Sequence, residues 1–258
     1  MIKIAMKILE LFAFKGALKA VLSWPVFSMA SFKIITRAKI AGVFPRTVID
    51  IGGNIGQFSI AAQNLFDDPK IFSIEPDPTV ALKLKKNLQR LHGDDSAYVD
   101  ICAVSNIDGE AEFFVNYDNQ TSSIMQLGED RKSIFKQSKV IENIKVSSAK
   151  LDTLFRDRVL EKPILLKIDA QGAEGLIIDG AEELLNDVKW IILEVPFINL
   201  YNGELKFNDL VNKLASRGFS FDRPLNFHLD PKSGGIMEMD GLFVHKNPYK
   251  GSLNTHER

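Results

Sequence analysis

The sequence predicts an α/β fold with a mainly parallel sheet, and three observations support this class. From Thr47 onward, short β-rich apolar runs alternate with helix-like stretches, a pattern typical of βαβ units. The first of these runs leads directly into a glycine-rich turn. Two final apolar runs lie close together across a turn-rich loop, which indicates an antiparallel return at the end of the sheet.

The predicted strands are short, apolar runs of the length expected for buried strands. They occupy residues 47–51, 70–74, 97–101, 163–168, 190–195, 219–221 and 241–244. Further strands are expected at 111–115 and 144–147. Helices are predicted over residues 55–65, 78–91, 175–185 and 207–217, and Gly218 is expected to end the last of them.

Length and composition fit one globular α/β domain with an extension at each end. The chain has 258 residues, of which 45% are hydrophobic and 25% charged, as in ordinary globular proteins. We predict an extension over residues 1–46, the α/β domain over 47–246 and a polar tail over 247–258. The net charge of −1 gives no indication of a nucleic-acid partner. The single cysteine, Cys102, excludes an intramolecular disulfide and favours a cytoplasmic location.

The predicted extension, residues 1–46, is strongly basic, with eight Lys and Arg residues against one Glu. Apolar side chains recur at three- and four-residue intervals over residues 2–22 and predict one or two amphipathic helices. Such a helix can pack against the α/β domain and cover its mouth, or rest on the anionic inner face of a membrane. The longest uncharged run of this extension, residues 20–32, is too short to cross a bilayer.

The glycine-rich turn predicts a cofactor site. It contains Gly52, Gly53, Asn54 and Gly56 between the first strand and the following helix. Glycine permits left-handed backbone conformations and close approach to a ligand, and the start of a helix presents free N–H groups. Glu75 ends the next strand, near the ~20-residue spacing at which nucleotide-binding units place a carboxylate on ribose hydroxyls.

Two features of the turn distinguish between cofactors. A dinucleotide site requires a third glycine, and Phe58 and Ser59 stand where it would be expected. Asp50 precedes the turn, and its carboxylate would repel a pyrophosphate but attract a sulfonium or an amino group. The turn therefore favours S-adenosylmethionine over a nicotinamide cofactor.

Four sequence blocks, at residues 49–57, 74–78, 103–109 and 166–174, occur in an order that resembles the FkbM-type methyltransferases. This family is a branch of the class I S-adenosylmethionine-dependent methyltransferases. The block Leu-Lys-Ile-Asp-Ala-Gln-Gly-Ala-Glu at 166–174 is the most specific of the four. The likeness extends over about residues 47–245. Gly53 and Asn106 depart from it, since the family more often has Ala and Asp there.

The resemblance implies a Rossmann-like, seven-stranded, mostly parallel sheet with an antiparallel last strand. It also implies that S-adenosylmethionine lies across the carboxyl ends of the first strands. The residues expected to bind this cofactor are Asp50, Gly52, Gly53, Asn54, Gly56, Glu75, Pro76, Asp100, Ile101 and Ala103.

Acidic residues at the ends of the fourth and fifth strands indicate where the chemistry occurs. Asp169 and Glu194 end these strands, and strand carboxyl ends meet at the ligand crevice of an open α/β sheet. They are predicted either to hold a divalent cation such as magnesium that activates an acceptor hydroxyl, or to act without metal. In the metal-free alternative, Asp169 or the loop residue His228 is the general base. The resemblance also places Glu174 at the rim of the site.

The predicted activity is methyl transfer to an oxygen atom. By resemblance, the acceptor is a hydroxyl of a sugar, a glycan or another small natural product. A binding module without catalytic activity on the same fold is an alternative, although retention of Asp50, Glu75 and Asp169 speaks against it. A nicotinamide-dependent oxidoreductase is a third. Lys167 is expected to point to solvent or to pair locally.

Overall fold

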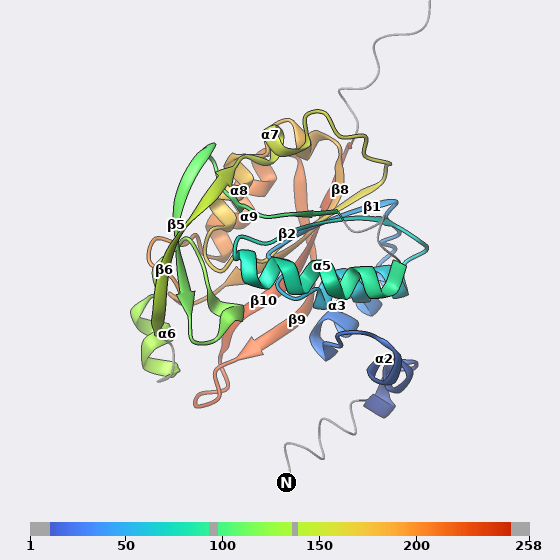
Figure 1. Ribbon diagram of the computed structural model, residues 1–258, viewed down its shortest axis with the longest axis horizontal. Helices are drawn as coiled ribbons and strands as arrows, with labels where there is room; N and C mark the ends of the chain where they lie inside the picture. The colour runs from blue at the N-terminus through green and yellow to red at the C-terminus, as the bar shows by residue number, and fades with distance from the viewer. Residues whose placement is uncertain (1–10, 93–97, 136–138, 249–258) are drawn as a thin grey trace, which may run out of the picture.

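A seven-stranded sheet forms the centre of the computed structural model, which describes residues 11–92, 98–135 and 139–248 (Figure 1). The strand order is β3-β2-β1-β7-β8-β10-β9. The strands are β1 (Thr47–Ile51), β2 (Lys70–Ile74), β3 (Tyr98–Asp100), β7 (Ile164–Ile168), β8 (Val188–Pro196), β9 (Phe219–Leu229) and β10 (Ile236–His245). β10 pairs antiparallel with β8 and β9, whereas β1, β2, β3, β7 and β8 pair in parallel. The predicted sheet with its antiparallel last strand is confirmed.

Helices cover both faces of this sheet. One layer contains α3 (Met29–Ile40), α4 (Gln57–Leu65) and α5 (Pro78–His92), and the other contains α7 (Leu151–Phe155), α8 (Glu174–Asp179) and α9 (Phe207–Ser216). Alternate side chains of β1 enter different cores, because successive residues of a strand point to opposite faces. Val48 packs in the cluster of α3 and α4, and Ile49 packs in the cluster of α7, α8 and α9. All five residues of β1 are buried, and three of them, Val48, Ile49 and Ile51, are aliphatic, as expected of a strand covered on both faces.

A second, three-stranded sheet lies beside the first (Figure 1). It consists of β4 (Ala103–Val104), β5 (Gly109–Asn116) and β6 (Val140–Ala149). The chain between β5 and β6 includes the 3₁₀ turn η1 (Asn119–Thr121) and the short helix α6 (Glu129–Ile134). The strands predicted at 111–115 and 144–147 fall within β5 and β6.

The helix predicted over residues 175–185 is wrong in its length. α8 ends at Asp179, and the 3₁₀ turn η2 (Leu184–Asn186) follows. Gly180 packs closely on the backbone of Ser105, where an added Cβ would lie 2.1 Å from the carbonyl oxygen. The Asp152 carboxylate accepts hydrogen bonds from the backbone N–H groups of Glu183 and Leu184. These tertiary contacts end the helix where sequence periodicity would continue it.

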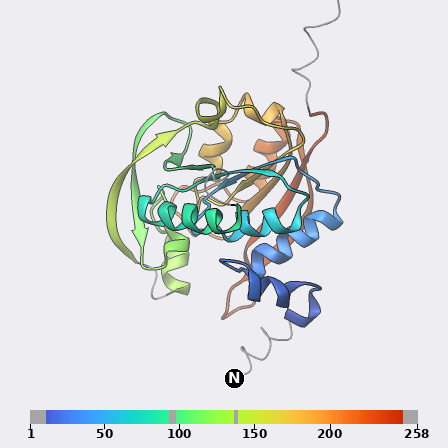
Figure 2. The same cartoon turned by 45° about the vertical axis from the view of Figure 1, so that its right-hand side comes forward.

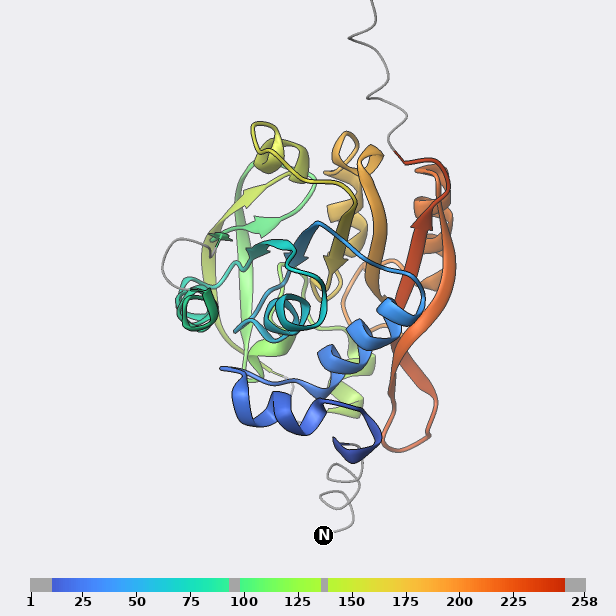
Figure 3. The ribbon, with the colours of Figure 1, turned by 90° about the vertical axis from the view of Figure 1, so that its right-hand side faces the viewer.

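The last two strands are much longer than predicted. β9 and β10 pair along residues 219–229 and 236–245, and their hairpin reaches toward the end of the molecule where α2 (Ala17–Ser23) lies (Figure 3). Backbone hydrogen bonds to an antiparallel neighbour form whatever the side chain is. The two strands can therefore continue through polar residues, where the sequence shows no apolar run. His228 therefore lies in β9, and its expected position in a loop is corrected.

Helix α3 belongs to the core of the α/β domain. Ser28 caps it by accepting a hydrogen bond from the Ser31 N–H at 3.3 Å. The helix packs against α4 and β9 (Figure 2). Its residues Ile34, Ile35 and Ala38 are buried in the core beneath it. α3 thus packs against the domain, whereas the two alternatives for the helices expected in residues 2–22 stay predictions. Residues 1–10 and 249–258 lie outside the described residues. In the part of the chain that is described, the helices lack the length and apolar character that crossing a membrane requires.

Candidate functional site

A cavity of about 730 Å³ lies at the carboxyl ends of β1, β2, β7 and β8. Its walls also include residues 28–34 of the N-terminal segment, residues 117–124 between β5 and β6, and residues of β9 and β10. Its volume is in the range of small-molecule sites, and its position is the one at which open parallel sheets bind ligands.

One end of the cavity is formed by the turn between β1 and α4. Gly52 has a φ of 74°, and a Cβ at this position would lie 1.9 Å from the backbone oxygen of Asp169. The N–H groups of Gly52 and Gly53 both donate to the Ile74 carbonyl at 3.0 Å. The turn is thus fixed to the ends of β2 and β7, and only glycine fits at Gly52.

Glu75 stands next to this turn and lines the cavity. Its Oε2 accepts a hydrogen bond from the Asn54 N–H at 2.9 Å, and its Oε1 accepts one from the Asp77 N–H at 3.1 Å. Burial raises the pKa of Glu75 to about 7, and the two hydrogen bonds offset part of this effect. Each oxygen keeps a lone pair for a further donor, such as a hydroxyl of a bound ligand.

A buried lysine lies between the two ends of the cavity. Lys167 of β7 is 6% exposed. Its Nζ donates to Asp169 Oδ2 at 2.9 Å and lies 3.6 Å from Asp50 Oδ1. Burial opposes protonation, but the charges of Asp169 and Asp50 raise the pKa of Lys167 above its ordinary value. The ammonium therefore stays charged, and it neutralises carboxylates that would otherwise be buried unpaired.

Gln171 connects the carboxylates of β7 and β8. It lies in a turn with a φ of 56°, followed by Gly172 with a φ of 99°. Its Nε2 donates to Asp169 Oδ1 at 2.9 Å and to Glu194 Oε2 at 2.6 Å. The Tyr201 hydroxyl is 2.7 Å from Gln171 Oε1 and fixes the amide. Burial raises the pKa of Glu194, and the neighbouring Asp169 carboxylate adds to this effect.

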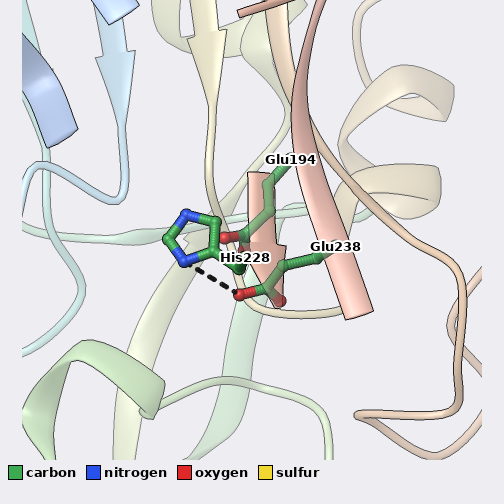
Figure 4. A group of neighbouring side chains, drawn as sticks. All are labelled: Glu194, His228 and Glu238. Atoms are coloured by element: carbon green, nitrogen blue, oxygen red, sulfur yellow. Dashed lines mark ion pairs between the residues drawn. The ribbon is translucent and has the colours of Figure 1, made fainter. Parts of the chain in front are cut away.

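At the other end, three side chains from adjacent strands point toward one another (Figure 4). Glu194 of β8, His228 of β9 and Glu238 of β10 each offer one ligand atom, and these atoms lie within 4.8 Å of one another. Strand register explains the cluster, because Glu238 is opposite His228 and Asp240 is opposite Glu194. Residues two apart on a strand share a face, so Asp240 also faces the cavity.

The charges around His228 favour its protonated form. Its Nε2 lies 3.6 Å from Asp240 Oδ2, and its Nδ1 lies 3.8 Å from Glu238 Oε1. Interaction with Asp240 raises the pKa of His228, burial opposes this, and Glu238 adds to it. The Asn226 amide nitrogen is 3.2 Å from both His228 Nε2 and Asp240 Oδ2.

Residues 50–221, more than half of the chain, match the family model described as the methyltransferase FkbM domain. The chain belongs to the FkbM methyltransferase family. Membership defines methyl transfer as the class of reaction, and it supports S-adenosylmethionine as the methyl donor. The matched residues include the turn after β1, Glu75 and Asp169.

Two curated proteins are similar to this FkbM methyltransferase. The 2-O-methyltransferase NoeI of Sinorhizobium fredii is 27% identical over 175 residues, which cover 66% of this chain and 71% of that protein. Methyltransferase 1 of Beauveria bassiana is 24% identical over 183 residues, which cover 67% of this chain and 72% of that protein.

Among solved structures, magnesium protoporphyrin IX methyltransferase from Synechocystis with bound S-adenosylmethionine has a TM-score of 0.46 and 13% identity, covering 84% of this chain and 78% of that chain. The mitomycin 7-O-methyltransferase has a TM-score of 0.44 and 12% identity, covering 83% of this chain and 53% of that chain. Neither likeness bears on the acceptor of this FkbM methyltransferase.

Most residues predicted for the site of this FkbM methyltransferase line the cavity. On the cofactor side they are Gly52, Gly53, Asn54, Glu75, Pro76 and Ala103, and on the acceptor side they are Asp169, Glu194 and His228. The cavity wall does not include Asp50, Gly56, Asp100, Ile101 and Glu174.

These five residues stand behind the wall or beside it. Asp50 is fully buried and accepts a hydrogen bond from the Ser59 hydroxyl at 2.6 Å. Asp100 forms two hydrogen bonds of 2.7 Å with Arg158. Glu174 accepts a hydrogen bond from the Ala170 N–H at 3.0 Å, and burial raises its pKa to about 8. We therefore expect Asp50 and Glu174 to support the two turns rather than contact a ligand.

Several residues of the cavity wall are absent from the sequence-based prediction. Lys167 is buried and pairs locally, so its alternative orientation toward solvent is wrong. Glu238 and Asp240 lie two apart, which is a signal for a shared strand face, but the predicted strand began only at residue 241. Arg131 of α6 also lines the cavity, with its guanidinium 5.3 Å from the centre of the Tyr201 ring. No sequence signal identifies Arg131.

Proposed function

We propose that this protein transfers the methyl group of S-adenosylmethionine to a hydroxyl oxygen of a sugar, a glycan or another small natural product. The observation that supports this most is one cavity with two unlike ends. A rigid backbone turn with Glu75 stands at one end, and a wall of carboxylates with His228 stands at the other. A cofactor and an acceptor can thus share one space.

The cofactor end fits S-adenosylmethionine. The turn at Gly52 and Gly53 leaves room for close approach because it carries no side chain. The Glu75 carboxylate lines the cavity and has lone pairs suited to ribose hydroxyls. S-adenosylmethionine supplies an electrophilic methyl group on a sulfonium. A sulfonium also benefits from the negative potential of the nearby carboxylates.

The acceptor end would align a hydroxyl and remove its proton, which is the help that an oxygen acceptor needs for in-line methyl transfer. Asp169 is one candidate for the base, and Lys167 and Gln171 hold it in place. Although burial opposes ionisation, Lys167 holds the pKa of Asp169 below its ordinary value, which makes it a weak base. His228 is the better base once it has lost its proton.

This assignment predicts that methyl transfer accelerates as pH rises. The interactions with Asp240 and Glu238 raise the pKa of His228 above its ordinary value, so the neutral imidazole forms at higher pH than in a free histidine. We expect kcat to increase with pH in wild type, and to lose most of this dependence in His228→Gln. A pH profile unchanged by His228→Gln would assign the base to another group.

The direct test uses S-adenosylmethionine with an isotopically labelled methyl group and a panel of sugars, glycans and small hydroxyl compounds. The expected product is a labelled methyl ether, identified by mass spectrometry and NMR, and Asp169→Asn should lower its rate of formation. Transfer to nitrogen or sulfur would contradict the proposal. Cofactor binding without any transfer across the panel would favour the binding-module alternative.

We also propose that the basic extension, residues 1–46, brings the protein to the cytoplasmic face of an anionic membrane. Phe12 is 70% exposed and Leu22 is 80% exposed, and Lys15 and Lys19 stand between them in sequence. Apolar and basic side chains together suit an anionic lipid surface. We expect salt-sensitive sedimentation with anionic liposomes that Leu22→Ser weakens. Binding to neutral liposomes alone, or none at all, would contradict this.

A further inference from the structure

We propose that Glu194, His228 and Glu238 form a binding site for a divalent transition-metal ion at the acceptor end of the cavity. One ligand atom from each residue lies within 4.8 Å of the other two. A bound ion would occupy a ring nitrogen of His228. In the ion-bound protein the ion therefore activates the acceptor hydroxyl in place of His228 as general base. This role rests on the proposed function, whereas binding of the ion does not.

The three residues converge because three adjacent strands carry them to the same edge of the sheet. Glu194 lies near the end of β8 and His228 near the end of β9, and Glu238 lies near the start of the antiparallel β10. The separation of 3.8 Å between His228 Nδ1 and Glu238 Oε1 is longer than a hydrogen bond. It is, however, a spacing that two ligands can take around one ion with bonds of about 2.0–2.2 Å.

The ligand set indicates which metals are suited to the site. One imidazole nitrogen with two carboxylates suits Mn²⁺, Zn²⁺ or a similar ion, whereas Mg²⁺ prefers oxygen ligands and near-ideal octahedral geometry. Asp240 Oδ2 lies 3.6 Å from His228 Nε2, on the side where a histidine bound to metal through Nδ1 carries its remaining N–H. Outer carboxylates of metal sites accept from that N–H and orient the ring, and Asp240 is placed to do so here.

Asp169, which the sequence analysis paired with Glu194 as a metal ligand, is less suited to this role. Its Oδ2 accepts a hydrogen bond from Lys167 and its Oδ1 accepts one from Gln171. An ion at Asp169 would also stand beside the Lys167 ammonium, and like charges repel. The contacts of Asp169 thus place the cation site one strand further along, toward β9 and β10.

The charge balance of the wall also favours a cation. Glu194, Glu238 and Asp240 line the cavity, and Arg131 contributes one cation to the same wall. The nearby Lys167 ammonium is engaged by Asp169 and Asp50. A bound divalent ion would neutralise this cluster. Three protein ligands would leave coordination positions for the acceptor oxygen, as in catalytic metal sites.

Electron paramagnetic resonance of Mn²⁺ added to the chelator-treated full chain tests this proposal. We expect one bound Mn²⁺ per chain, with electron spin echo modulation from a ligating nitrogen. His228→Ala should abolish the nitrogen signal, and both His228→Ala and Glu238→Gln should weaken Mn²⁺ binding at least tenfold. Zn²⁺ should displace the bound Mn²⁺. Glu112→Gln, which removes an exposed carboxylate on β5, is the matched control and should bind Mn²⁺ as wild type does.

S-adenosylhomocysteine binding by the same variants shows whether they are folded. Wild type that binds S-adenosylhomocysteine but neither Mn²⁺ nor Zn²⁺ would overturn the metal site, and so would equal Mn²⁺ binding by wild type and both folded variants. In either case His228 would act as an imidazolium between Glu238 and Asp240. Failure of the proposed function is a different result, since Mn²⁺ would then bind as described while no acceptor is methylated.

Discussion

The two ends of the cavity present different parts of the chain to a ligand. At the cofactor end, the surface is mainly the backbone of the turn after β1, with Glu75 beside it. This turn is hydrogen-bonded to the end of β2 and packs closely on the backbone of Asp169, directly after β7. At the acceptor end, the surface consists of side chains from β7, β8, β9 and β10. The first end therefore depends on chain geometry, and the second depends on how buried charges are balanced. Substitutions at the cofactor end should therefore act through backbone geometry, and substitutions at the acceptor end should act through charge.

The largest effect is expected for Gly52→Ala at the cofactor end. The new Cβ would overlap the Asp169 carbonyl oxygen at 1.9 Å, and the φ of 74° is unfavourable for alanine. We expect a loss of about 3 kcal/mol or more in the free energy of unfolding, together with loss of S-adenosylhomocysteine binding. Urea denaturation and calorimetry measure the two quantities.

Gly42→Ala is the matched control for this substitution. Gly42 has a φ of 86°, but an added Cβ would have no heavy atom within 4 Å. It should cost only about 1 kcal/mol and leave ligand binding intact. Equal losses in the two variants would show that backbone conformation, rather than contact with β7, makes Gly52 necessary.

The next largest effect is expected for Lys167→Met, which tests the charge balance between the ends. It leaves the buried Asp50 and the partly buried Asp169 without a cation, so the unfolding free energy should fall by about 3 kcal/mol at pH 7. Without Lys167, the pKa of each carboxyl group rises in the folded variant. The variant therefore loses stability as pH rises, because the fold then has to hold these groups in their ionised form. The deficit should therefore be smaller at pH 5. Lys83→Met, at an exposed site on α5, is the control and should change the unfolding free energy little. A deficit of Lys167→Met that is equal at pH 5 and pH 7 would contradict this charge balance.

A moderate effect is expected at Glu75, whose pKa is about 7 because of burial. The ionised carboxylate is the stronger acceptor for ribose hydroxyls, so the affinity for S-adenosylhomocysteine should increase from pH 6 to pH 8. Glu75→Gln should bind about tenfold more weakly at pH 8 and lose the pH dependence, whereas His228→Gln should keep it. If the affinity of wild type for S-adenosylhomocysteine does not depend on pH, Glu75 does not contact the ligand.

The smallest effect on catalysis is expected for Glu174→Gln, because this residue supports the turn after β7 without lining the cavity. The amide keeps the shape of the acid, and kcat should stay within about threefold of wild type. The pKa of Glu174 is raised from 4.5 to about 8. Wild type therefore loses stability from this group as pH rises between those values, and Glu174→Gln should gain relative to it. A large loss of kcat would instead place Glu174 in contact with substrate.

The same contrast explains what the sequence could predict. The turn and Glu75 are local features, since a strand, a glycine turn and the next strand's terminal acid are close in sequence. The cluster of Glu194, His228 and Glu238 depends on the register of three strands. The sequence predicts a last strand that begins at residue 241, whereas β10 begins at Ile236, and Glu238 and Asp240 are missed for this reason. The early end of α8 depends on contact between Gly180 and Ser105. Long-range packing of this kind leaves no local pattern.

Calorimetric titration with S-adenosylhomocysteine, and separately with NAD, tests the central claim most directly. The account predicts that wild type binds S-adenosylhomocysteine, that Glu75→Ala weakens this binding, and that NAD does not bind. Binding of NAD in place of S-adenosylhomocysteine would contradict the assignment of the cofactor end. A folded protein that binds neither compound would contradict the proposed enzyme as a whole.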